Sequence, residues 1–308
     1  MRMYVAGING MVGSAIAIQA GKQGYEVFGK SSLELDFTDR TAVFKDLLES
    51  KPNALVIAAA KVGGIGANSA MPVNFLSINL QIQTNLLDAA HAAKIEKLLF
   101  LGSSCIYPRL ASQPISESAL LTGELEPTNE PYAIAKIAGL KLVEAYRRQF
   151  GQHWISAMPT NLYGPRDNFN LQGGHVLPAL MHRFHKAKIA GDSAVTVWGD
   201  GTPLREFLHV EDLARACLML LSNYDDSVAI NIGSGQEVSI KNLAEIISRV
   251  VGFSGDIVFD KSHPNGTPQK LLDSTRIEKR GWKPKISLQD GISSTYDWFV
   301  MHHDKEPA

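Results

Sequence analysis

The chain has 308 residues, of which 45% are hydrophobic and 20% charged, and its 30 basic and 31 acidic residues leave a formal net charge of -1. This length suggests two domains, or one large α/β body that carries a smaller lobe. Proteins that neutralise nucleic-acid phosphates show a basic excess, so we expect no nucleic-acid partner. The two cysteines, Cys105 and Cys217, are too few for a disulfide framework or a structural zinc site. We therefore expect no metal, and a reducing, cytoplasmic compartment.

Two uncharged stretches imitate membrane or export segments. Residues 62–87 contain no charge, but their six Asn and Gln side chains, one proline and three glycines would be costly in hydrocarbon. Residues 3–21 are also uncharged, but Gly7, Gly10 and Gly13 interrupt the apolar run. We expect neither a membrane span nor a signal peptide.

In the first half of the chain, apolar runs alternate with helical patterns. We predict strands at residues 3–6, 25–29, 54–59, 97–101 and 154–158, and helices at residues 11–21, 41–49, 74–93 and 132–150. Strands that are apolar throughout are typical of a parallel sheet with helices on both faces. Right-handed crossovers then give a doubly wound, Rossmann-type α/β fold.

After residue 159 the pattern changes to loops rich in Gly and Pro. Regular structure recurs in two helices and one strand, which we predict at residues 211–221, 240–251 and 229–232. We expect a smaller, loop-rich lobe that supplies substrate specificity. The resulting division gives a dinucleotide-binding domain of residues 1–162 plus about 206–232, and a substrate-binding lobe of about 163–205 and 233–308.

A glycine-rich turn separates the first predicted strand from the first predicted helix. Its sequence is Gly7-Ile8-Asn9-Gly10-Met11-Val12-Gly13, with the spacing G-x-x-G-x-x-G rather than the standard G-x-G-x-x-G. Glycines here permit a tight turn and a close approach to a pyrophosphate, which the N-terminus of the helix then binds. The position of the turn favours a dinucleotide cofactor.

Residues 24–31 match the phosphate-loop pattern G-x-x-x-x-G-K-[ST] letter for letter. A phosphate loop follows a strand, whereas here a helix precedes Gly24 and residues 25–28 are strand-like, so we reject an ATP site. Lys30, Ser31 and Ser32 instead end the second strand, where an acid selects NAD and basic or hydroxylic residues accommodate NADP. NADP(H) is favoured, and the alternative is that Lys30 is a solvated strand end.

Tyr132 and Lys136 lie four residues apart on one face of a predicted helix. The ammonium group should favour the phenolate, lower the tyrosine pKa from about 10 and suit the phenol to proton transfer with a carbonyl oxygen. Ser103 follows the fourth strand at its carboxyl end, where open α/β sheets bind ligands, and its hydroxyl can bond the same carbonyl.

The ordered set of glycine turn, Ser103, and Tyr132 with Lys136 resembles the extended short-chain dehydrogenase/reductase family, which acts largely on nucleotide sugars. Four segments narrow the resemblance: residues 59–65 (AAKVGGI), 102–108 (GSSCIYP), 126–132 (EPTNEPY) and 161–165 (NLYGP). They are similar to the family members that convert GDP-4-keto-6-deoxy-D-mannose to GDP-L-fucose. The similarity covers nearly the whole chain, including Trp198, residues 201–209 and residues 270–273.

This resemblance implies a bifunctional, NADPH-dependent enzyme. Ser103, Tyr132 and Lys136 would carry the reduction at carbon 4, and Cys105 and His175 would be the base and acid that epimerise carbons 3 and 5. The ketone acidifies both carbons, and each inversion needs one group to remove a proton and another to return it on the opposite face. A thiol with a pKa of about 8.5 is mostly protonated at neutral pH, so the surroundings of Cys105 should activate it. Without the resemblance, Cys105 would be interpreted as an inert thiol and His175 as a loop histidine.

The binding residues follow from the turn, the strand ends and the resemblance together. The cofactor set is Gly7, Asn9, Gly10, Met11, Val12, Gly13, Lys30, Ser31, Ser32, Ala59, Ala60, Tyr132, Lys136, Pro159, Asn161, Leu162 and His175. The GDP-sugar set is Ser104, Asn161, Arg183, Trp198, Arg205 and Lys270, with solvated surface charge as the alternative for Lys270. Family members often carry a basic residue at the position of Asn9, so this asparagine weakens the NADP preference.

Two other functions stay open on the sequence alone. An NAD-dependent 4-epimerase has no need of Cys105, and a 4,6-dehydratase needs an acid pair near positions 104 and 105, where this chain has Ser and Cys. A non-catalytic dinucleotide sensor would not need the set of Ser103, Tyr132 and Lys136. For assembly, the resemblance implies a homodimer in which the helices at 74–93 and 132–150 form a four-helix bundle.

Overall fold

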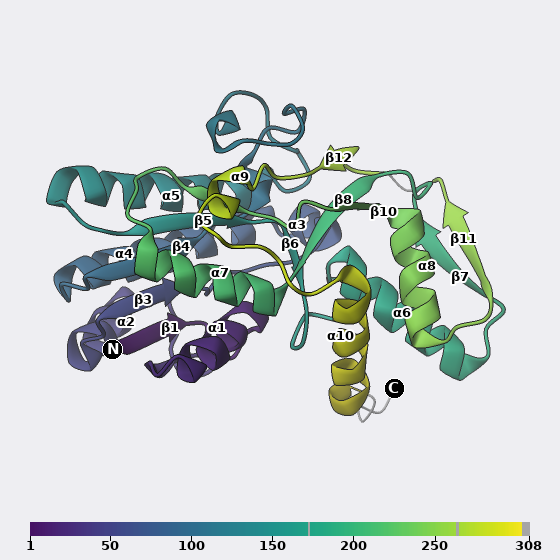
Figure 1. Cartoon of the computed structure of the whole chain (residues 1–308), viewed down its shortest axis with the longest axis horizontal. Coiled ribbons are helices and arrows are strands. Elements are labelled where there is room, and N and C mark those ends of the chain that lie inside the picture. The colour runs from purple at the N-terminus through teal and green to yellow at the C-terminus, as the bar shows by residue number, and fades with distance from the viewer. Residues whose placement is uncertain (172, 263–264, 304–308) are drawn as a thin grey trace.

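The computed structural model describes residues 1–171, 173–262 and 265–303, and at its centre lies a six-stranded parallel sheet (Figure 1). The strand order is β2-β1-β3-β4-β5-β9. The strands are β1 (Arg2–Ala6), β2 (Glu26–Lys30), β3 (Ala54–Ile57), β4 (Lys97–Leu101), β5 (Ile155–Pro159) and β9 (Ile230–Ile232). From β1 the chain places β2 on one side and β3 on the other, so the order in which strands are added reverses between β1 and β3. Sheets of this kind bind ligands at such a point, beyond the carboxyl ends of the strands.

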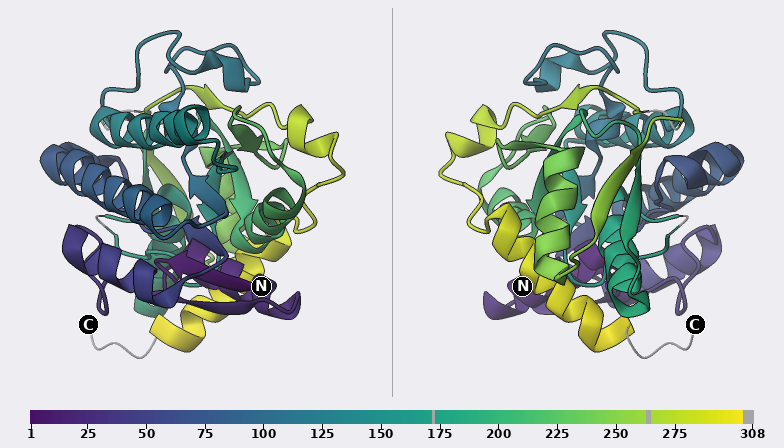
Figure 2. Two further views of the ribbon diagram at one scale, coloured as in Figure 1. Left: turned by 90° about the vertical axis from the view of Figure 1, so that its left-hand side faces the viewer. Right: turned by 90° about the vertical axis from the view of Figure 1, so that its right-hand side faces the viewer.

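The sheet is buried on both faces, which is why its strands read as continuous apolar runs. In β1, Met3 and Val5 belong to one hydrophobic core, and Tyr4 and Ala6 belong to the other. On the first face lie α1 (Met11–Lys22) and α7 (Val210–Asn223). On the second face lie α2 (Arg40–Ser50), α4 (Asn79–Ala92) and α5 (Glu130–Phe150), as Figure 2 shows. The predicted doubly wound α/β fold is therefore confirmed.

A third core lies in a lobe beside the sheet, formed largely by residues after 162 (Figure 1). At its centre, β8 (Leu204–His209) pairs in parallel with two strands and antiparallel with a third: β6 (Asn161–Tyr163), β12 (Gln269–Lys270) and β10 (Glu237–Ser239). A separate parallel pair joins β7 (Ala194–Trp198) to β11 (Asp256–Asp260). The helices of this core are α6 (Val176–Ala190), α8 (Ile240–Val251) and α10 (Leu288–His303).

Short helices complete the connections. They are α3 (Ile65–Ala70), α9 (Thr275–Glu278), a π-helix at Asn74–Ile78 and two 3₁₀ helices at Ser104–Ile106 and Glu117–Ala119. The strand predicted at 54–59 ends at Ile57. The prediction missed the helices at 176–190 and 288–303 and the strands at 161–163, 194–198 and 204–209. Short strands among Gly and Pro loops leave little periodic signal. Residues 26–30 form β2 and no helix begins at Ser31, so the phosphate-loop match is a coincidence of letters.

The uncharged stretch at 62–87 uses its amides to bind backbone groups. Asn79 accepts from the Lys61 N–H at 2.8 Å and donates to the Lys61 carbonyl at 3.0 Å, which fixes the loop after β3. Gln83 donates to the Ala135 carbonyl at 2.6 Å and so joins α4 to α5. Burying an amide costs little free energy when it finds such a partner. The same amides facing lipid would have no partner, and their burial would be costly. Within the described ranges, no helix is long and apolar enough to cross a membrane.

Candidate active site

The glycine turn between β1 and α1 is closely packed. Gly7 has φ +82°, donates its N–H to the Lys30 carbonyl at 3.0 Å, and lies so near Ala59 that a Cβ would come within 3.0 Å of the Ala59 backbone. A Cβ on Gly13 would overlap the carbonyl oxygen of Gly7. The first turn of α1 carries no acidic residue and no side-chain cap, so its N–H groups and positive dipole end suit a pyrophosphate. The turn therefore fits a dinucleotide.

The end of β2 is less open to an extra phosphate than its sequence suggests. Ser31 is buried, and its N–H and hydroxyl donate to the Glu34 carboxylate at 2.9 and 2.7 Å. These hydrogen bonds lower the pKa of Glu34. A phosphate at this place would compete with that carboxylate for both donors. Of the three residues predicted to receive it, only Lys30 supplies positive charge, and the exposed Asn9 adds none.

Ser103, Tyr132 and Lys136 come together where β4 ends and α5 begins. The Ser103 hydroxyl accepts from the Cys105 N–H at 3.3 Å, which caps the 3₁₀ helix at Ser104–Ile106, and it also hydrogen-bonds Tyr132. The Lys136 Nζ lies 5.9 Å from the centre of the Tyr132 ring and donates to the Leu101 carbonyl at 2.8 Å. The helical spacing of Tyr132 and Lys136 thus brings phenol and ammonium to the same strand end, as predicted.

The expectation that Lys136 lowers the pKa of Tyr132 is wrong for this structure. Burial raises the pKa of Tyr132, the neighbouring Cys105 raises it further, and the hydrogen bond with Ser103 opposes the change. Lys136 is only 4% exposed, and burial lowers the pKa of its ammonium to about 8. That ammonium is directed at a carbonyl rather than at the phenolic oxygen. Tyr132 therefore stays protonated at neutral pH, which is the state that a proton donor requires.

Of the two predicted epimerisation residues, Cys105 lies in the 3₁₀ helix Ser104–Ile106 and contacts the N-cap residue of α5, and His175 is itself the N-cap residue of α6. The Cys105 Sγ is partly exposed and accepts a hydrogen bond from the Asn129 Nδ2 at 3.4 Å, just before α5. His175 directly precedes α6 and is accessible to solvent, and the protein packed around it lowers the pKa of its imidazole by desolvation. The loop before His175 is joined to the loop after β3, because the Gly64 N–H donates to the Gly173 carbonyl at 3.0 Å.

The basic and aromatic residues predicted to bind substrate form two pairs in the lobe. The Arg183 guanidinium on α6 lies 5.8 Å from the centre of the exposed Trp198 ring and donates to the Thr196 carbonyl at 2.6 Å. Arg205 and Lys270 are register partners in β8 and β12, so their side chains leave that small sheet on the same side. Two adjacent cations suit a diphosphate, and an exposed indole ring suits stacking on a base.

The other predicted binding residues differ in how far they are buried. Ser104 is 2% exposed, and the Asn161 amide donates to the Glu206 carbonyl at 2.8 Å. Six further members of the cofactor set lie at four places in the fold. Met11 and Val12 are in the first turn of α1, Ala59 and Ala60 in the loop after β3, Pro159 at the end of β5 and Leu162 in β6. Ser32, at the end of β2, is exposed.

Sequence reasoning did not single out Asn129 or Phe75. Asn129 contacts the Cys105 sulfur, and the buried ring of Phe75 packs edge-to-face against the Tyr132 ring, with centroids 6.4 Å apart. The sequence did offer a signal for Asn129, because this residue lies within the segment 126–132, three residues before Tyr132. Phe75 had none, since no local pattern links it to a residue 57 positions further along the chain.

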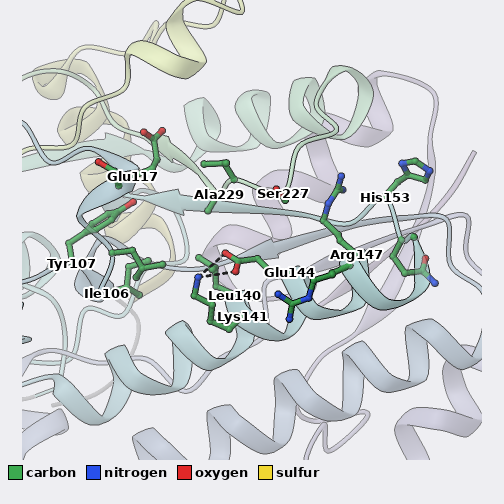
Figure 3. Close-up of a pocket in the computed structure, with 16 residues that line it drawn as sticks. Ile106, Tyr107, Glu117, Leu140, Lys141, Glu144, Arg147, His153, Ser227 and Ala229 are labelled. Atoms are coloured by element: carbon green, nitrogen blue, oxygen red, sulfur yellow. Dashed lines mark hydrogen bonds and ion pairs between the residues drawn. The ribbon is translucent and has the colours of Figure 1, made fainter. Parts of the chain in front are cut away.

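A cavity of about 800 Å³ lies away from this site, between the second half of α5 and the residues before β9 (Figure 3). Several of its charged groups have partners: Lys141 binds Glu144 at 2.8 Å, and Arg147 and His153 bind Asp225 at 2.8 and 2.6 Å. None of the predicted catalytic or binding residues lines it. The residues predicted for catalysis and binding therefore do not point to this cavity.

The chain resembles known proteins along almost all of its length. The family model described as the NAD dependent epimerase/dehydratase family matches residues 3–233. The chain is 56% identical over 302 residues to GDP-L-fucose synthase 1 of Arabidopsis thaliana, covering 98% of this chain and 94% of that protein. It is 50% identical over 314 residues to the GDP-L-fucose synthase of Escherichia coli strain K12, covering 99% and 98%. A crystal structure of a GDP-L-fucose synthetase from Naegleria fowleri bound to NADP superimposes with a TM-score of 0.90 at 28% identity, covering 99% of this chain and 95% of that one.

Proposed function

The chain belongs to the NAD dependent epimerase/dehydratase family, and we propose that it converts GDP-4-keto-6-deoxy-D-mannose into GDP-L-fucose with NADPH as reductant. One observation carries this proposal beyond the family: a thiol, Cys105, stands beside the reductive set of Ser103, Tyr132 and Lys136, close enough to raise the pKa of the tyrosine. A simple reductase or 4-epimerase needs only the serine, tyrosine and lysine of this reductive set. An enzyme that also inverts carbons next to the ketone needs a further base in the same place.

We assign the cofactor to the glycine turn and the neighbouring strand ends. The turn of Gly7 to Gly13 would hold the pyrophosphate, Lys30 with Ser31 and Ser32 the ribose phosphate, and Lys136 the nicotinamide ribose. When bound, NADPH supplies the hydride for carbon 4. The division into a dinucleotide-binding domain (1–162 and about 206–232) and a substrate-binding lobe (about 163–205 and 233–308) is part of the same proposal. It is supported by the separate hydrophobic core of the lobe.

Reduction needs a proton for the oxygen that forms at carbon 4. Tyr132 holds that proton, because its raised pKa keeps the phenol protonated at neutral pH. The Ser103 hydroxyl, already hydrogen-bonded to the phenol, stabilises the same oxygen. Lys136 keeps a positive charge beneath the ring, which favours the phenolate that remains after the transfer.

Epimerisation precedes reduction, because it needs the ketone. The Cys105 thiolate takes the proton from carbon 3, and the electrons of that C–H bond move into an enolate whose charge rests on the carbon-4 oxygen. His175 then returns a proton to the opposite face, and the same exchange occurs at carbon 5. Tyr132 and Ser103 stabilise the enolate oxygen by hydrogen bonds. Cys105 and His175 regain their starting protonation states from solvent.

The lobe would bind the rest of the nucleotide sugar. Arg205 and Lys270, side by side on the small sheet, match the diphosphate, and Arg183 with Trp198 provides an aromatic and cationic surface for the nucleoside. Ser104 and Asn161 lie nearest the strand ends and would approach the sugar.

For assembly we propose a homodimer through a four-helix bundle of α4 and α5. The two helices lie side by side on one face of the sheet (Figure 2), and α5 carries an incompletely buried stripe of Ile134, Ala138, Leu142 and Ala145. The small residues would let a second copy approach closely. We also propose a cytoplasmic location, since Cys105 must stay a free thiol to act as a base.

Separate loss of the two half-reactions tests the proposed function. In Cys105→Ser, deuterium exchange from solvent into carbons 3 and 5 should fall at least about 100-fold, while NADPH still reduces part of the unepimerised ketone. In Tyr132→Phe, NADPH oxidation should fall by a similar factor of about 100 while exchange continues. Product analysis by NMR with GDP-4-keto-6-deoxy-D-mannose measures both. Equal loss of both activities in both variants, with folding intact, would contradict this division of roles.

A further inference from the structure

We propose that Asn129 is a positioning residue of the epimerisation site, whose side-chain amide favours the thiolate of Cys105 by donating a hydrogen bond to its sulfur. The inference rests on the proposed role of Cys105 as the base. It adds to that role the group that makes a thiol usable as a base at neutral pH. Asn129 contacts the atom that accepts the substrate proton, with Nδ2 and Sγ 3.4 Å apart.

The position of Asn129 in the fold makes this contact unusual. Asn129 is the N-cap residue of α5, where an asparagine side chain normally accepts from the backbone N–H of the second or third helical residue. Here the side chain makes no capping bond, and the second helical residue is Pro131, which has no N–H. The side chain turns to Cys105 instead. Helix capping therefore does not explain why an asparagine stands here.

The unused end of the amide supports a role in both protonation states of the thiol. The Asn129 Oδ1 is buried and has no hydrogen-bond partner within the described part of the chain. While the sulfur is a thiolate, it can only accept, and the amide N–H is the matching donor. Once the sulfur has taken a proton, a half-turn of the amide brings Oδ1 to accept from the S–H. A carboxylate could serve only the second state.

Cys105 has a second source of stabilisation in the same helix. A group in contact with the N-cap side chain lies at the positive end of α5, and a 21-residue helix presents its full terminal dipole there. Of the titratable groups around the thiol, Tyr132 is neutral, Lys136 is bound to the Leu101 carbonyl, and Glu130 in the first turn of α5 is exposed. From the lobe, desolvation lowers the pKa of His175. The amide is the direct contact among these groups.

Two substitutions separate this role from a structural one. Asn129→Ser and Asn129→Asp both remove the amide donor, and both introduce side chains that cap helices well, so α5 should keep its stability. The pH dependence of Cys105 alkylation by iodoacetamide, followed by peptide mapping, should show the thiol pKa raised by about one unit in Asn129→Ser and by more in Asn129→Asp. The fully buried Cys217 should not react and serves as the internal control.

Activity adds a second readout. At pH 7, deuterium exchange into carbons 3 and 5 should fall in Asn129→Ser by the ratio of the two thiolate fractions, which is between about 2-fold and 10-fold for a one-unit rise in the thiol pKa, and should recover as the pH is raised. In a Cys105→Ser background, adding Asn129→Ser should change the residual NADPH oxidation less than about 2-fold, because the amide acts through the sulfur.

The outcomes also distinguish this inference from the proposed function. Normal exchange together with alkylation profiles that superimpose on the wild type would overturn the role of Asn129 and leave the function intact. An absence of exchange in the wild type, with the alkylation shift present, would overturn the epimerase function and with it the positioning role. Unchanged melting temperatures with both expected shifts would support the inference.

Discussion

Lys136 carries the largest electrostatic cost at the site. Lys136 is only 4% exposed, its ammonium donates to the neutral Leu101 carbonyl, and no ion pair to it occurs within the residues that the structure describes. Burial accordingly lowers its pKa to about 8, against an ordinary value near 10.5. A charge kept in place at such a cost is typical of a group retained for function rather than for stability.

Removing this buried charge should stabilise the protein while abolishing reduction. At pH 7 the folded state holds a proton on Lys136 at a cost that the unfolded chain does not have, so Lys136→Met should raise the free energy of unfolding by about 1–3 kcal/mol. Between pH 8 and 10.5 the unfolded chain still binds that proton while the folded protein has released it, so wild-type stability rises with pH relative to the variant. The gain should therefore shrink through that range.

Urea denaturation at pH 7, 8.5 and 9.5 measures this difference. Lys141→Met, an exposed position on the same helix, is the matched control and should change stability by less than about 0.5 kcal/mol. A Lys136→Met variant less stable than the wild type at every pH would show that the hydrogen bond to Leu101 outweighs the cost of the charge.

Among the helices, α1 contains two glycines whose replacement should have opposite effects on stability. Gly13 faces the Gly7 carbonyl with no room for a Cβ, whereas a Cβ on Gly21, near the other end of the helix, meets nothing within 4 Å. The first glycine is needed for helix and strand to approach, and the second is simply a poor helix former in an exposed position.

Opposite effects are therefore expected from the same substitution in α1. Gly13→Ala should push α1 away from the glycine turn. It should lower the free energy of unfolding by about 1–3 kcal/mol and weaken NADPH binding more than 10-fold. Gly21→Ala should stabilise by about 0.5–1 kcal/mol and leave NADPH binding unchanged. Fluorescence titration with NADPH and thermal denaturation measure the two effects. Equal NADPH affinity in both variants would disprove the cofactor assignment of the turn.

In the whole molecule, α5 connects functions that lie far apart. Its N-terminus holds Tyr132 and the contact between Asn129 and Cys105, its middle carries the stripe around Ala138, and its last turns border the separate cavity (Figure 3). The hydrogen bond between Gly64 and Gly173 joins the lobe to the loop after β3. We therefore expect the proposed active site to be complete only when sheet, lobe and α5 are in place together.

Dimerisation through α4 and α5 gives a direct prediction. Ala138→Arg places a long charged side chain in the middle of the stripe and should convert the dimer to a monomer at micromolar concentration, since an interface of this kind tolerates little overpacking. Ile18→Arg, at an exposed position of α1 on the opposite face of the sheet, should remain dimeric. Sedimentation velocity measures both, and a monomeric wild type would contradict the proposed assembly.

The sequence by itself determined the parts of this protein that local patterns encode. Apolar runs between helical periods defined the parallel sheet, the glycines at 7, 10 and 13 marked the turn, and a spacing of four placed Tyr132 above Lys136. These features depend on residues that are close to one another in the sequence, so they can be recognised from a single sequence. The resemblance of short segments supplied the rest of the expected chemistry.

Tertiary structure decided everything that depends on distant neighbours or on the local dielectric. Arg205 and Lys270 became partners only through strand register, and Asn129 met Cys105 only because α5 begins where the loop after β4 turns. The spacing of Tyr132 and Lys136 correctly predicted their proximity, but not the sign of the pKa change, because burial is the largest cause of the shift in both groups. Burial is a property of the packed chain, and no stretch of sequence around either residue contains it.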